Sequence, residues 1–403
     1  AHVVDSPIAQ KALLRDGVTS VMDLEVGAFP VDTWYDNLAG RSQANYGANV
    51  SVVGARVAAF NPEFRKQAGK FKSRTGNIVE GLYGGMPIGD DWVKRVATDK
   101  ERQLVLELVE EGLKRGALGV GPPTGYMTEG FSSQEMLGVH KLAGKYGRLT
   151  HVHTRFSSQM SPTSGILAFQ EAFAAAEPYG AGVIIAHFTA QALALSEPAM
   201  AYVDDLREQG TPVALEVYPY TYGAAGNGVS ADYLKPDNYQ KNMGRSYKDI
   251  IDIKTGKPLD KATYDRLVKE EPNHPVMFAN AKEEDVLKAV AHPDVLIGCD
   301  CFPFTSNKTS KMVTDWDTPW EELNGHPRTA GAHAKVLRLT REKKLMPLMQ
   351  AISKMNYQYA KFLEENGTPQ MAFKGRIQVG ADADITIFDP NTVTDNSMLE
   401  QGK

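Results

Sequence analysis

Residues 148–155 read RLTHVHTR, residues 182–188 read GVIIAHF and residues 295–300 read VLIGCD. Each segment is an apolar run with a histidine or an aspartate at or near its end: His153, His187 and Asp300. In a barrel of parallel strands the side chains at the carboxyl ends converge on one face, so these three residues are expected to meet despite their distance in sequence. Two imidazoles and a carboxylate in one place suggest a metal-dependent hydrolase.

Strand-like and helix-like segments alternate along most of the chain, which is typical of βα units around a parallel sheet. Further strands are expected at 18–25 (VTSVMDLE), 49–57 (NVSVVGARV), 117–121 (ALGVG) and 211–220 (TPVALEVYPY). Helices are expected at 101–115, 132–146, 163–177, 198–209 and 282–291, and two more within 332–366. The pattern predicts an α/β fold, a (β/α)8 TIM-type barrel.

The predicted organisation is a barrel over residues 1–370 followed by a small β appendage and tail over 371–403. Residues 223–274 are polar and irregular, and we interpret them as an insertion on the substrate side of the barrel. Residues 302–328 form a second long loop on the same face. The tail segment GRIQVGADADITIFDP (375–390) alternates like strands around a tight turn. Because the chain opens at Ala1 and reaches its first element quickly, the appendage is expected to be incomplete at the N-terminus.

Composition and charge narrow the partners of the chain. Its 403 residues are 42% hydrophobic and carry a formal net charge of −5, so no basic stripe for nucleic acid is present. No apolar run approaches the roughly 20 residues that span a bilayer. The expected partner is a small-molecule substrate, with no nucleic acid and no membrane, and a homo-oligomer is left open. The two cysteines are compatible with a reducing cytosol, and we expect a cytoplasmic protein.

Three neighbours of the candidate site have structural interpretations. His151 points to the same side as His153, but one layer deeper, where core hydrogen bonding is the expected role. Cys299 and Cys301 flank Asp300 too closely to suggest a disulfide framework, and they are expected to be small core residues without a redox role. No lysine ends a clear barrel strand, so no carboxylated lysine bridge is expected.

Eight segments in order carry a resemblance to a known family. They are GVTSVMDLE, GALGVGPPTGY, THVHTR, IIAHF, EVYPYTYGAAG, IGCD, HPRTAGAHAKVLRL and GRIQVGADADITIFDPNTVTD. Together they resemble the amidohydrolase superfamily, specifically its D-aminoacylase (N-acyl-D-amino-acid deacylase) branch, over nearly the whole chain. The resemblance implies one or two zinc ions, or another divalent metal, as cofactor.

Two departures from the family pattern concern metal ligands. The family carries a His-x-His metal motif at its first barrel strand, and His2 looks like the second member of that pair. The D-aminoacylase pattern also has a metal-binding cysteine where this chain reads MDLEVG, and Glu25 falls within one residue of it. A carboxylate can bridge two divalent ions, so Glu25 is the expected ligand and Asp23 the competing candidate.

The resemblance implies hydrolysis of the amide bond of N-acyl-D-amino acids. His153 and His187 would hold the metal, and metal-bound hydroxide would attack the acyl carbon, with Asp300 as general base and then general acid. The substrate carboxylate needs a partner, for which Arg328 is the first choice and Arg155 the second. Tyr218, Tyr220 and His326 complete the expected substrate-binding residues.

Alternative interpretations remain open from the sequence. A cyclic amide hydrolase of the hydantoinase or dihydroorotase kind would use the same metal chemistry on a ring. A metal-poor, non-catalytic barrel would follow if the incomplete His-x-His motif cannot hold an ion. For single residues, Arg328 as an ordinary ion pair and Glu25 as a helix cap or a partner for lysine are the structural alternatives.

Overall fold

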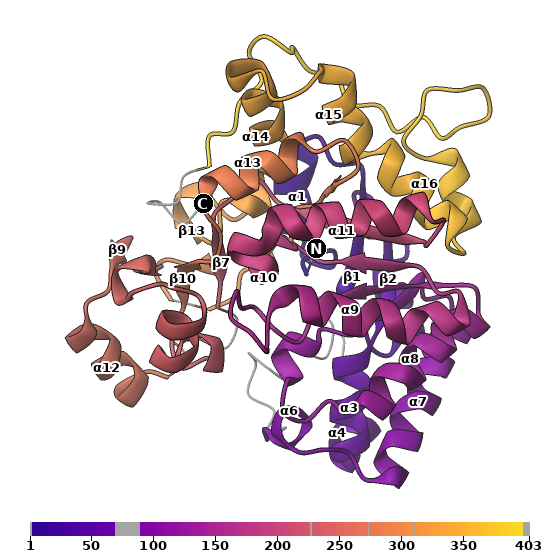
Figure 1. The fold of residues 1–403 in the computed structure, drawn as a ribbon. Helices are drawn as coiled ribbons and strands as arrows, with labels where there is room; N and C mark the ends of the chain where they lie inside the picture. Colours follow the sequence, from indigo (N-terminus) through magenta and orange to yellow (C-terminus); the bar gives the residue numbers. More distant parts are fainter. Residues whose placement is uncertain (1, 69–88, 226–227, 273, 310, 398–403) are drawn as a thin grey trace.

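Seven parallel strands form one sheet at the centre of the molecule (Figure 1). The computed structural model of the chain describes residues 2–68, 89–225, 228–272, 274–309 and 311–397. The strands of the sheet, in spatial and chain order, are β1 (Ser20–Ala28), β2 (Asn45–Ser51), β3 (Gly119–Gly121), β4 (Leu149–Val152), β5 (Val183–Ile185), β6 (Val213–Val217) and β11 (Leu296–Ile297). Every neighbouring pair is parallel, so all seven carboxyl ends lie at the same edge of the sheet.

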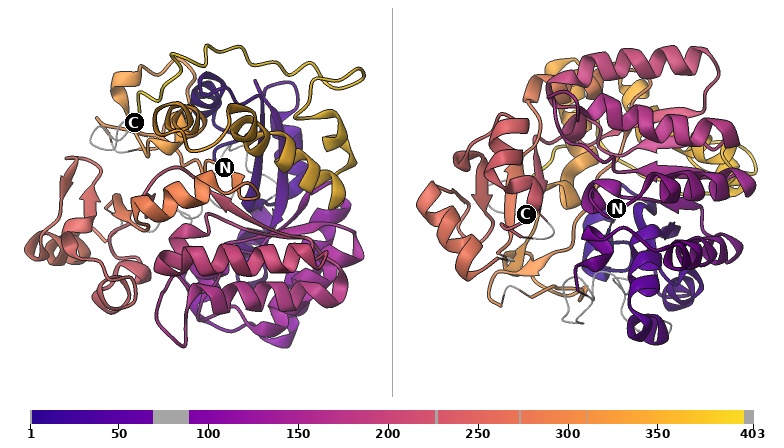
Figure 2. Two further views of the ribbon diagram at one scale, coloured as in Figure 1. Left: turned by 45° about the horizontal axis from the view of Figure 1, so that its top comes forward. Right: turned by 60° about the horizontal axis from the view of Figure 1, so that its bottom comes forward.

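Helices connect these strands and cover the sheet (Figure 2). They are α1 (Pro7–Arg15), α2 (Val31–Leu38), α3 (Val52–Phe60), α4 (Pro62–Gln67), α6 (Asp91–Lys94), α7 (Asp99–Lys114), α8 (Ser133–Lys145), α9 (Gly165–Ala176), α10 (Thr189–Ala192), α11 (Ser196–Glu208), α13 (Glu283–Ala291), α14 (Arg328–Lys343), α15 (Leu348–Met355) and α16 (Tyr357–Glu365). None of the described helices is long and apolar enough to cross a membrane.

Alternating side chains of the strands build two separate cores. Ile185 packs in the large core that the strands share with the surrounding helices, whereas its neighbour Ile184 belongs to a smaller inner cluster. Successive strand residues point to opposite faces, which explains the division. Ala360 and Leu363 of α16 complete the inner cluster. The inside of the sheet is therefore filled, and the functional groups are left to its carboxyl edge.

Two helices begin where the sequence places a capping motif. The hydroxyl oxygen of Thr98 accepts a hydrogen bond from the backbone N–H of Glu101, whose carboxylate accepts from the N–H of Thr98 in return. Ser132 and Glu135 make the same reciprocal pair at the start of α8. Such capping boxes satisfy backbone donors that the first turn leaves free. The helices predicted at 101–115 and 132–146 are confirmed.

The strand predicted at 49–57 is wrong beyond residue 51. The Ser51 hydroxyl oxygen accepts a hydrogen bond from Gly54 N–H at 3.1 Å, and α3 begins at Val52. All residues from Val52 to Ala59 are buried, and Arg56 is the one charged residue among them, so this helix has no exposed polar face. A short, continuous apolar run does not distinguish a buried strand from a buried helix, because it has no periodicity to read.

The predicted insertion has a sheet of its own. β7 (Tyr222–Ala224), β10 (Val276–Ala279), β8 (Ile250–Asp252) and β9 (Lys257–Pro258) pair antiparallel in that order, beside α12 (Lys261–Glu270). A separate apolar cluster that includes Val229, Leu234 and Tyr264 packs under this sheet. The unit projects from one side of the barrel (Figure 1). In the second long loop, β12 (Thr305–Ser306) pairs antiparallel with β13 (Leu323–Asn324).

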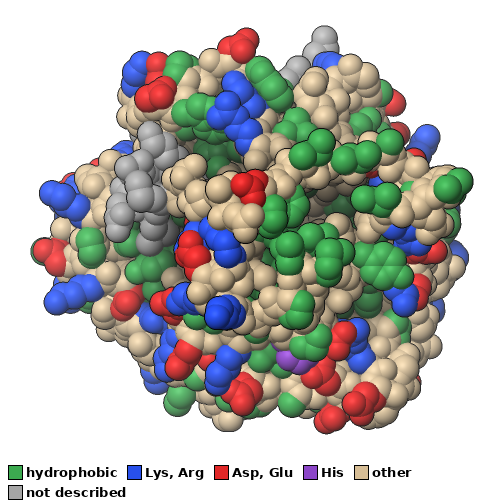
Figure 3. Space-filling model, turned by 90° about the horizontal axis from the view of Figure 1, so that it is seen from above, with side chains coloured by type: hydrophobic (Ala, Val, Ile, Leu, Met, Phe, Trp, Pro, Cys, Tyr) green, Lys and Arg blue, Asp and Glu red, His purple; other side chains and the backbone are tan. Residues whose placement is uncertain are grey.

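The last part of the chain differs from the prediction in two ways. Three helices, α14, α15 and α16, stand where two were expected. In the described tail no residue from 374 to 397 belongs to a strand, so the predicted pair of strands is absent there. A strand needs a neighbouring backbone to satisfy its N–H and C=O groups, and none of the described segments pairs with this one. Ile377, Val379 and Ile387 are more than nine-tenths exposed, and Figure 3 shows apolar side chains gathered on the face that carries α14, α15 and the tail.

Buried His140 predicts a pH dependence of stability. Its Nδ1 lies 2.9 Å from the carbonyl oxygen of Met136 within α8, and its Nε2 has no hydrogen-bond partner among the described residues. Burial lowers the pKa of His140 to about 4. The unfolded chain, with a usual pKa near 6.5, therefore takes up the proton first as the pH falls, and the folded state loses stability between about pH 6.5 and pH 4.

A His140→Leu variant removes this contribution. The interval from 6.5 to about 4 corresponds to about 3 kcal/mol in the free energy of unfolding. Urea denaturation at pH 7 and pH 4 is expected to show that the wild type loses about that much more stability than the variant. Equal losses in both proteins would contradict the buried, neutral state of His140.

Candidate metal centre

Five side chains, four from strands of the sheet or the turns that follow them and one from the N-terminal segment, meet at one point. Glu25 lies in β1, His153 follows β4 by one residue, and His187 follows β5 by two. Asp300 follows β11 by three residues, and His2 reaches the same place through its backbone N–H, which donates to the carbonyl oxygen of Cys301 at 2.9 Å. The parallel sheet brings these ends together, as the sequence analysis predicted for His153, His187 and Asp300.

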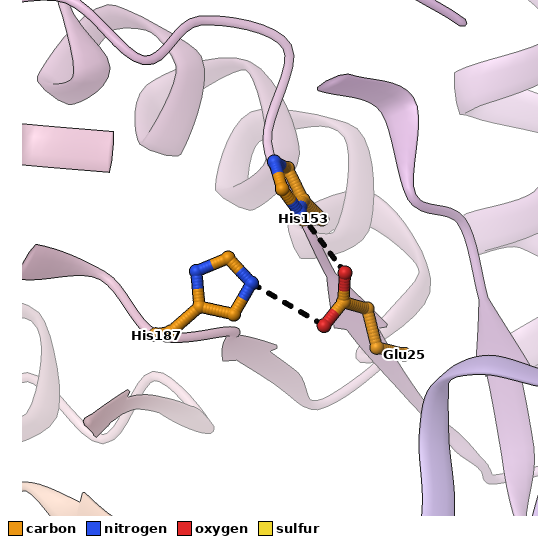
Figure 4. Close-up of side chains that lie close together, drawn as sticks. All are labelled: Glu25, His153 and His187. Atoms are coloured by element: carbon orange, nitrogen blue, oxygen red, sulfur yellow. Dashed lines mark hydrogen bonds and ion pairs between the residues drawn. The ribbon is translucent and has the colours of Figure 1, made fainter. Parts of the chain in front are cut away.

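Glu25, His153 and His187 form the first potential ligand group (Figure 4). Nδ1 of His153 lies 2.9 Å from Oε1 of Glu25, and Nε2 of His187 lies 3.3 Å from Oε2. The two imidazole rings stand nearly perpendicular, with their centroids 4.7 Å apart. One carboxylate thus faces two imidazole nitrogens, one on each oxygen.

His2, Glu25 and Asp300 form a second potential ligand group that shares Glu25 with the first. Nε2 of His2 lies 3.1 Å from Oδ1 of Asp300 and 3.6 Å from Oε2 of Glu25. Nδ1 of His2 lies 3.5 Å from Asp23, so the competing candidate Asp23 borders this group without entering either one. Glu25 is therefore the carboxylate positioned to bridge two ions.

The electrostatics of the two groups suit a cation. Burial would raise the pKa of Glu25, but His187, His153 and His2 hold it well below its usual value. Burial would likewise raise the pKa of Asp300, which Arg328 and His187 keep low. Both carboxylates are thus ionised in a buried place, where a charge is costly unless it is compensated.

The pKa values of the three histidines shift in different directions. Burial lowers the pKa of His153, which favours the neutral imidazole that a metal requires. Burial opposes protonation of His2 and His187 as well, but the surrounding carboxylates raise the pKa of both rings. A divalent cation would supply the positive charge that these protons provide. Imidazole and carboxylate donors in this number fit zinc or a similar ion.

Two residues of the site have a backbone conformation that favours glycine. The φ angles of His187 and Asp300 are 26° and 44°. Non-glycine residues with positive φ are uncommon, and they concentrate at functional sites because the surrounding structure must maintain them. From these positions His187 faces Glu25, and Asp300 faces His2 and Arg328.

Arg328 and Tyr218 border the site beside Asp300. Nη1 of Arg328 lies 2.9 Å from Oδ2 of Asp300, and its guanidinium lies over the ring of Tyr218 at 4.9 Å. Nε of Arg328 is buried and has no hydrogen-bond partner among the described residues. The Tyr218 hydroxyl accepts a hydrogen bond from the amide nitrogen of Asn280 at 2.8 Å, and burial raises its pKa to about 12. Its proton is therefore retained and available to another acceptor.

His326 positions Arg328 instead of facing the ligand groups. Its Nδ1 accepts the backbone N–H of Arg328 at 3.1 Å, so its proton lies on Nε2, which donates to the carbonyl oxygen of Tyr222 at 2.8 Å. Burial and the nearby Arg328 charge lower the pKa of His326 well below its usual value, which agrees with this neutral tautomer. Both ring nitrogens of His326 bind backbone groups, and its role in substrate binding stays a prediction.

Two other predicted substrate residues, Arg155 and Tyr220, make polar contacts outside the two ligand groups. Arg155 is bound to the carboxylate of Glu171 at 2.9 Å and to the carbonyl oxygens of Thr128 and Phe131, so its guanidinium is engaged in holding loops together. The Tyr220 hydroxyl lies 3.2 Å from Oγ of Ser397. The chain leaves strand geometry after Val217, because the N–H of Tyr220 bonds to the carbonyl oxygen of Tyr218. The alternation of side chains along a strand therefore does not apply to Tyr218 and Tyr220.

The layer beneath the site contains a polar cluster. Nε2 of His151 donates to Oε2 of Glu216 at 3.0 Å, and the Tyr359 hydroxyl donates to the same oxygen. His151 is thus a buried hydrogen-bonding residue, as predicted. The cluster joins β4, β6 and α16 below the ligand groups.

Two residues of the site were not identified from the sequence. The ring of Tyr126 lies 4.5 Å from that of His153, and burial together with the Glu25 charge raises its pKa well above the usual value. Gln191 donates to the carbonyl oxygen of Ala186 and accepts the N–H of Thr154, which fixes the turn that carries His187. Gln191 stands four residues after His187, and this helical spacing could have indicated that Gln191 supports the histidine.

Cys299 and Cys301 are joined by a disulfide across Asp300. This corrects the expectation of two unpaired core residues. Their Cα atoms are 4.9 Å apart, within the range that a disulfide can span. The close spacing of the two cysteines is unlike the frameworks of secreted domains, but a bent backbone brings positions i and i+2 within reach of each other.

Relatives with similar sequences are N-acyl-D-amino-acid deacylases. A D-aminoacylase from Alcaligenes xylosoxydans xylosoxydans is 25% identical over 335 residues, which cover 76% of this chain and 59% of the relative. An N-acyl-D-glutamate deacylase from the same organism is 25% identical over 74% of this chain and 57% of its own length. The chain is similar to the D-aminoacylases. It spans less than two thirds of the length of these relatives, and no protein-family model matches it.

Solved structures of deacylases of this kind share the fold of the chain. The N-acyl-D-glutamate deacylase of Bordetella bronchiseptica, complexed with zinc and a phosphonate inhibitor that mimics the tetrahedral intermediate, has a TM-score of 0.72 and 21% identity over 99% of this chain and 79% of its own. A D-aminoacylase structure has a TM-score of 0.69 and 20% identity over the same shares. The predicted α/β fold and the resemblance to the D-aminoacylase branch are confirmed. Of the eight barrel strands that were predicted, the described residues form seven in one parallel sheet, in which β1 and β11 are the unpaired edges.

Proposed function

We propose that this chain hydrolyses the amide bond of N-acyl-D-amino acids with the help of one or two divalent metal ions. The observation that carries the proposal is the convergence of His153, His187 and Asp300 on Glu25 at the carboxyl ends of the barrel strands. Similarity to N-acyl-D-amino-acid deacylases supplies the substrate class.

The ligands proposed for zinc are Glu25, His153 and His187 for one ion, and His2, Glu25 and Asp300 for a second. Bound zinc would polarise the acyl carbonyl and lower the pKa of a water molecule toward neutrality. Glu25 replaces the cysteine that the family resemblance implies, and its hard oxygen donors suit a bridge between two ions.

Asp300 is proposed as the proton-transfer residue. Its carboxylate is ionised, it borders both ligand groups, and it lies 3.9 Å from Nε2 of His187. It is therefore positioned to accept a proton from water as the new bond to the acyl carbon forms. The same carboxyl group then delivers this proton to the departing amide nitrogen, because an amine is a much better leaving group than its anion.

Arg328 and Tyr218 are proposed to bind the substrate. Arg328 has an unpaired buried Nε and a planar guanidinium that suits a carboxylate. The Tyr218 proton is free to hydrogen-bond to substrate, because Asn280 already donates to its oxygen. Asn280 follows β10, the strand that pairs with β7 and β8, so the sheet of the inserted unit adjoins Tyr218. We accordingly assign residues 223–274 to the substrate side.

The proposed function is tested by amino-acid release from matched substrates. The zinc-reconstituted chain is expected to release free amino acid from N-acetyl-D-amino acids and to act poorly on their L-enantiomers. A His153→Asn/His187→Asn variant serves as the inactive control. Ring opening of hydantoins without release from the N-acyl compounds would contradict the proposal and favour a cyclic amide hydrolase.

A further inference from the structure

The two cysteines of the chain form a three-residue ring around the proposed proton-transfer residue. Cys299 and Cys301 are bonded to each other, and Asp300 stands between them with a φ angle of 44°. The chain has no other cysteine. The crosslink spans Asp300 alone, so it restrains the backbone on both sides of this residue.

The same short segment holds the partners of the Asp300 carboxylate. The carbonyl oxygen of Cys301 accepts the backbone N–H of His2, whose ring lies 3.1 Å from Asp300. Sγ of Cys301 lies 3.8 Å from the carbonyl oxygen of Arg328, whose guanidinium pairs with Asp300. A change at Cys301 therefore acts on Asp300 through the backbone that the two residues share. It also acts through His2 and Arg328, which contact both Cys301 and Asp300.

We propose that the Cys299–Cys301 pair is a redox-sensitive positioning element for Asp300. The disulfide maintains the left-handed backbone that directs the carboxylate to His2 and Arg328. With the crosslink broken, Asp300 can relax toward the conformations that a non-glycine residue ordinarily adopts. The expected effect on turnover rests on the proposed function, whereas the effect on the position of Asp300 does not.

The chemistry is thiol–disulfide exchange with a low-molecular-weight thiol as co-reactant. Cys299 is 7% exposed and Cys301 is fully buried, so attack is expected at Sγ of Cys299. A reagent thiolate bonds to this sulfur, the Cys299–Cys301 bond breaks, and Cys301 leaves as a thiolate that takes up a proton. A second reagent thiol releases Cys299 and forms the reagent disulfide. The pair gains two electrons and two protons, and the two reagent thiols lose them.

The first test establishes the state of the pair in the whole chain. Maleimide labelling of the unfolded chain, followed by mass spectrometry, counts free thiols after incubation with glutathione disulfide and again after treatment with a phosphine reductant that is then removed. No label is expected in the first sample and one label on each cysteine in the second. Two free thiols in both samples would overturn the proposal.

The second test asks whether the pair positions Asp300. Reduction is expected to lower kcat for an N-acyl-D-amino acid about tenfold, equivalent to about 1.4 kcal/mol, with KM changed less than about twofold. Reoxidation is expected to restore kcat. A Cys299→Ser/Cys301→Ser variant is expected to have the kcat of the reduced wild type. Its kcat is expected to be the same with and without the reductant. Reduction of the wild type alone provides the result if this variant does not fold.

Cobalt(II) binding is the readout that does not require turnover. Asp300 belongs to the group with His2 and Glu25, so reduction is expected to weaken cobalt(II) binding there about tenfold in a titration followed by absorbance. A shift in cobalt affinity without hydrolysis in either state would retain the positioning role and reject the proposed function. Unchanged kcat together with unchanged cobalt affinity in the reduced chain would overturn the positioning role.

Discussion

The Asp300→Asn variant is expected to lose at least about 100-fold in kcat, the usual contribution of a general acid or base. The amide keeps the shape of the side chain, but it cannot accept a proton from water. His153, His187 and Glu25 are untouched, so the first metal ion is expected to remain bound. Steady-state kinetics on an N-acetyl-D-amino acid, with metal content measured on the same sample, checks both expectations.

Asp294→Asn is the matched control for this substitution. Asp294 precedes β11 at the end opposite to Asp300, and it pairs with Arg207 at 3.3 Å on the surface. The same chemical change there is expected to leave kcat within about twofold, because surface ion pairs contribute little. If Asp300→Asn retained full turnover while binding metal normally, another group would have to transfer the proton.

The Glu25→Gln variant is expected to lose metal from both ligand groups, because Glu25 is the residue that they share. Substitutions of residues that only support a ligand commonly cost 10–100-fold in metal affinity, so loss of a ligand itself is expected to cost at least about 100-fold. Turnover should fall in parallel. Competition with a chromophoric chelator measures the affinity of each variant for zinc.

Glu25→Cys is the control that separates ligation from packing. A thiolate keeps a negatively charged donor at this position and binds zinc well, so this variant is expected to retain at least one ion. Zinc affinity in Glu25→Gln within about twofold of the wild type would show that Glu25 is not a ligand and would direct attention to Asp23.

The sequence was sufficient for the barrel and for the centre of its site because both depend on strong local patterns. Capping boxes at Thr98 and Ser132 and apolar runs ending at His153 and His187 define elements and their ends directly. Once strands are parallel, their carboxyl ends must share one edge. The meeting of His153, His187 and Asp300 follows from topology, without knowledge of any single contact.

Features set by nonlocal contacts or by irregular backbone were not predictable in this way. Val52–Phe60 is buried on nearly all sides and has no apolar period that distinguishes helix from strand. Arg155 stands at a strand end like a ligand-binding residue, but Glu171, sixteen positions away, binds its guanidinium. Tyr220 and the Cys299–Cys301 bond depend on backbone that leaves strand geometry, where side-chain alternation no longer applies.

The number of metal ions per chain tests the central claim most directly. Elemental mass spectrometry is performed on the wild type and on the His153→Asn/His187→Asn variant after incubation with zinc and removal of the excess. Ligation at Glu25, His153 and His187 predicts one or two firmly held ions in the wild type. It predicts at least one ion fewer in the variant. No bound ion in the wild type, or an equal number in both proteins, would contradict a metal centre at these residues.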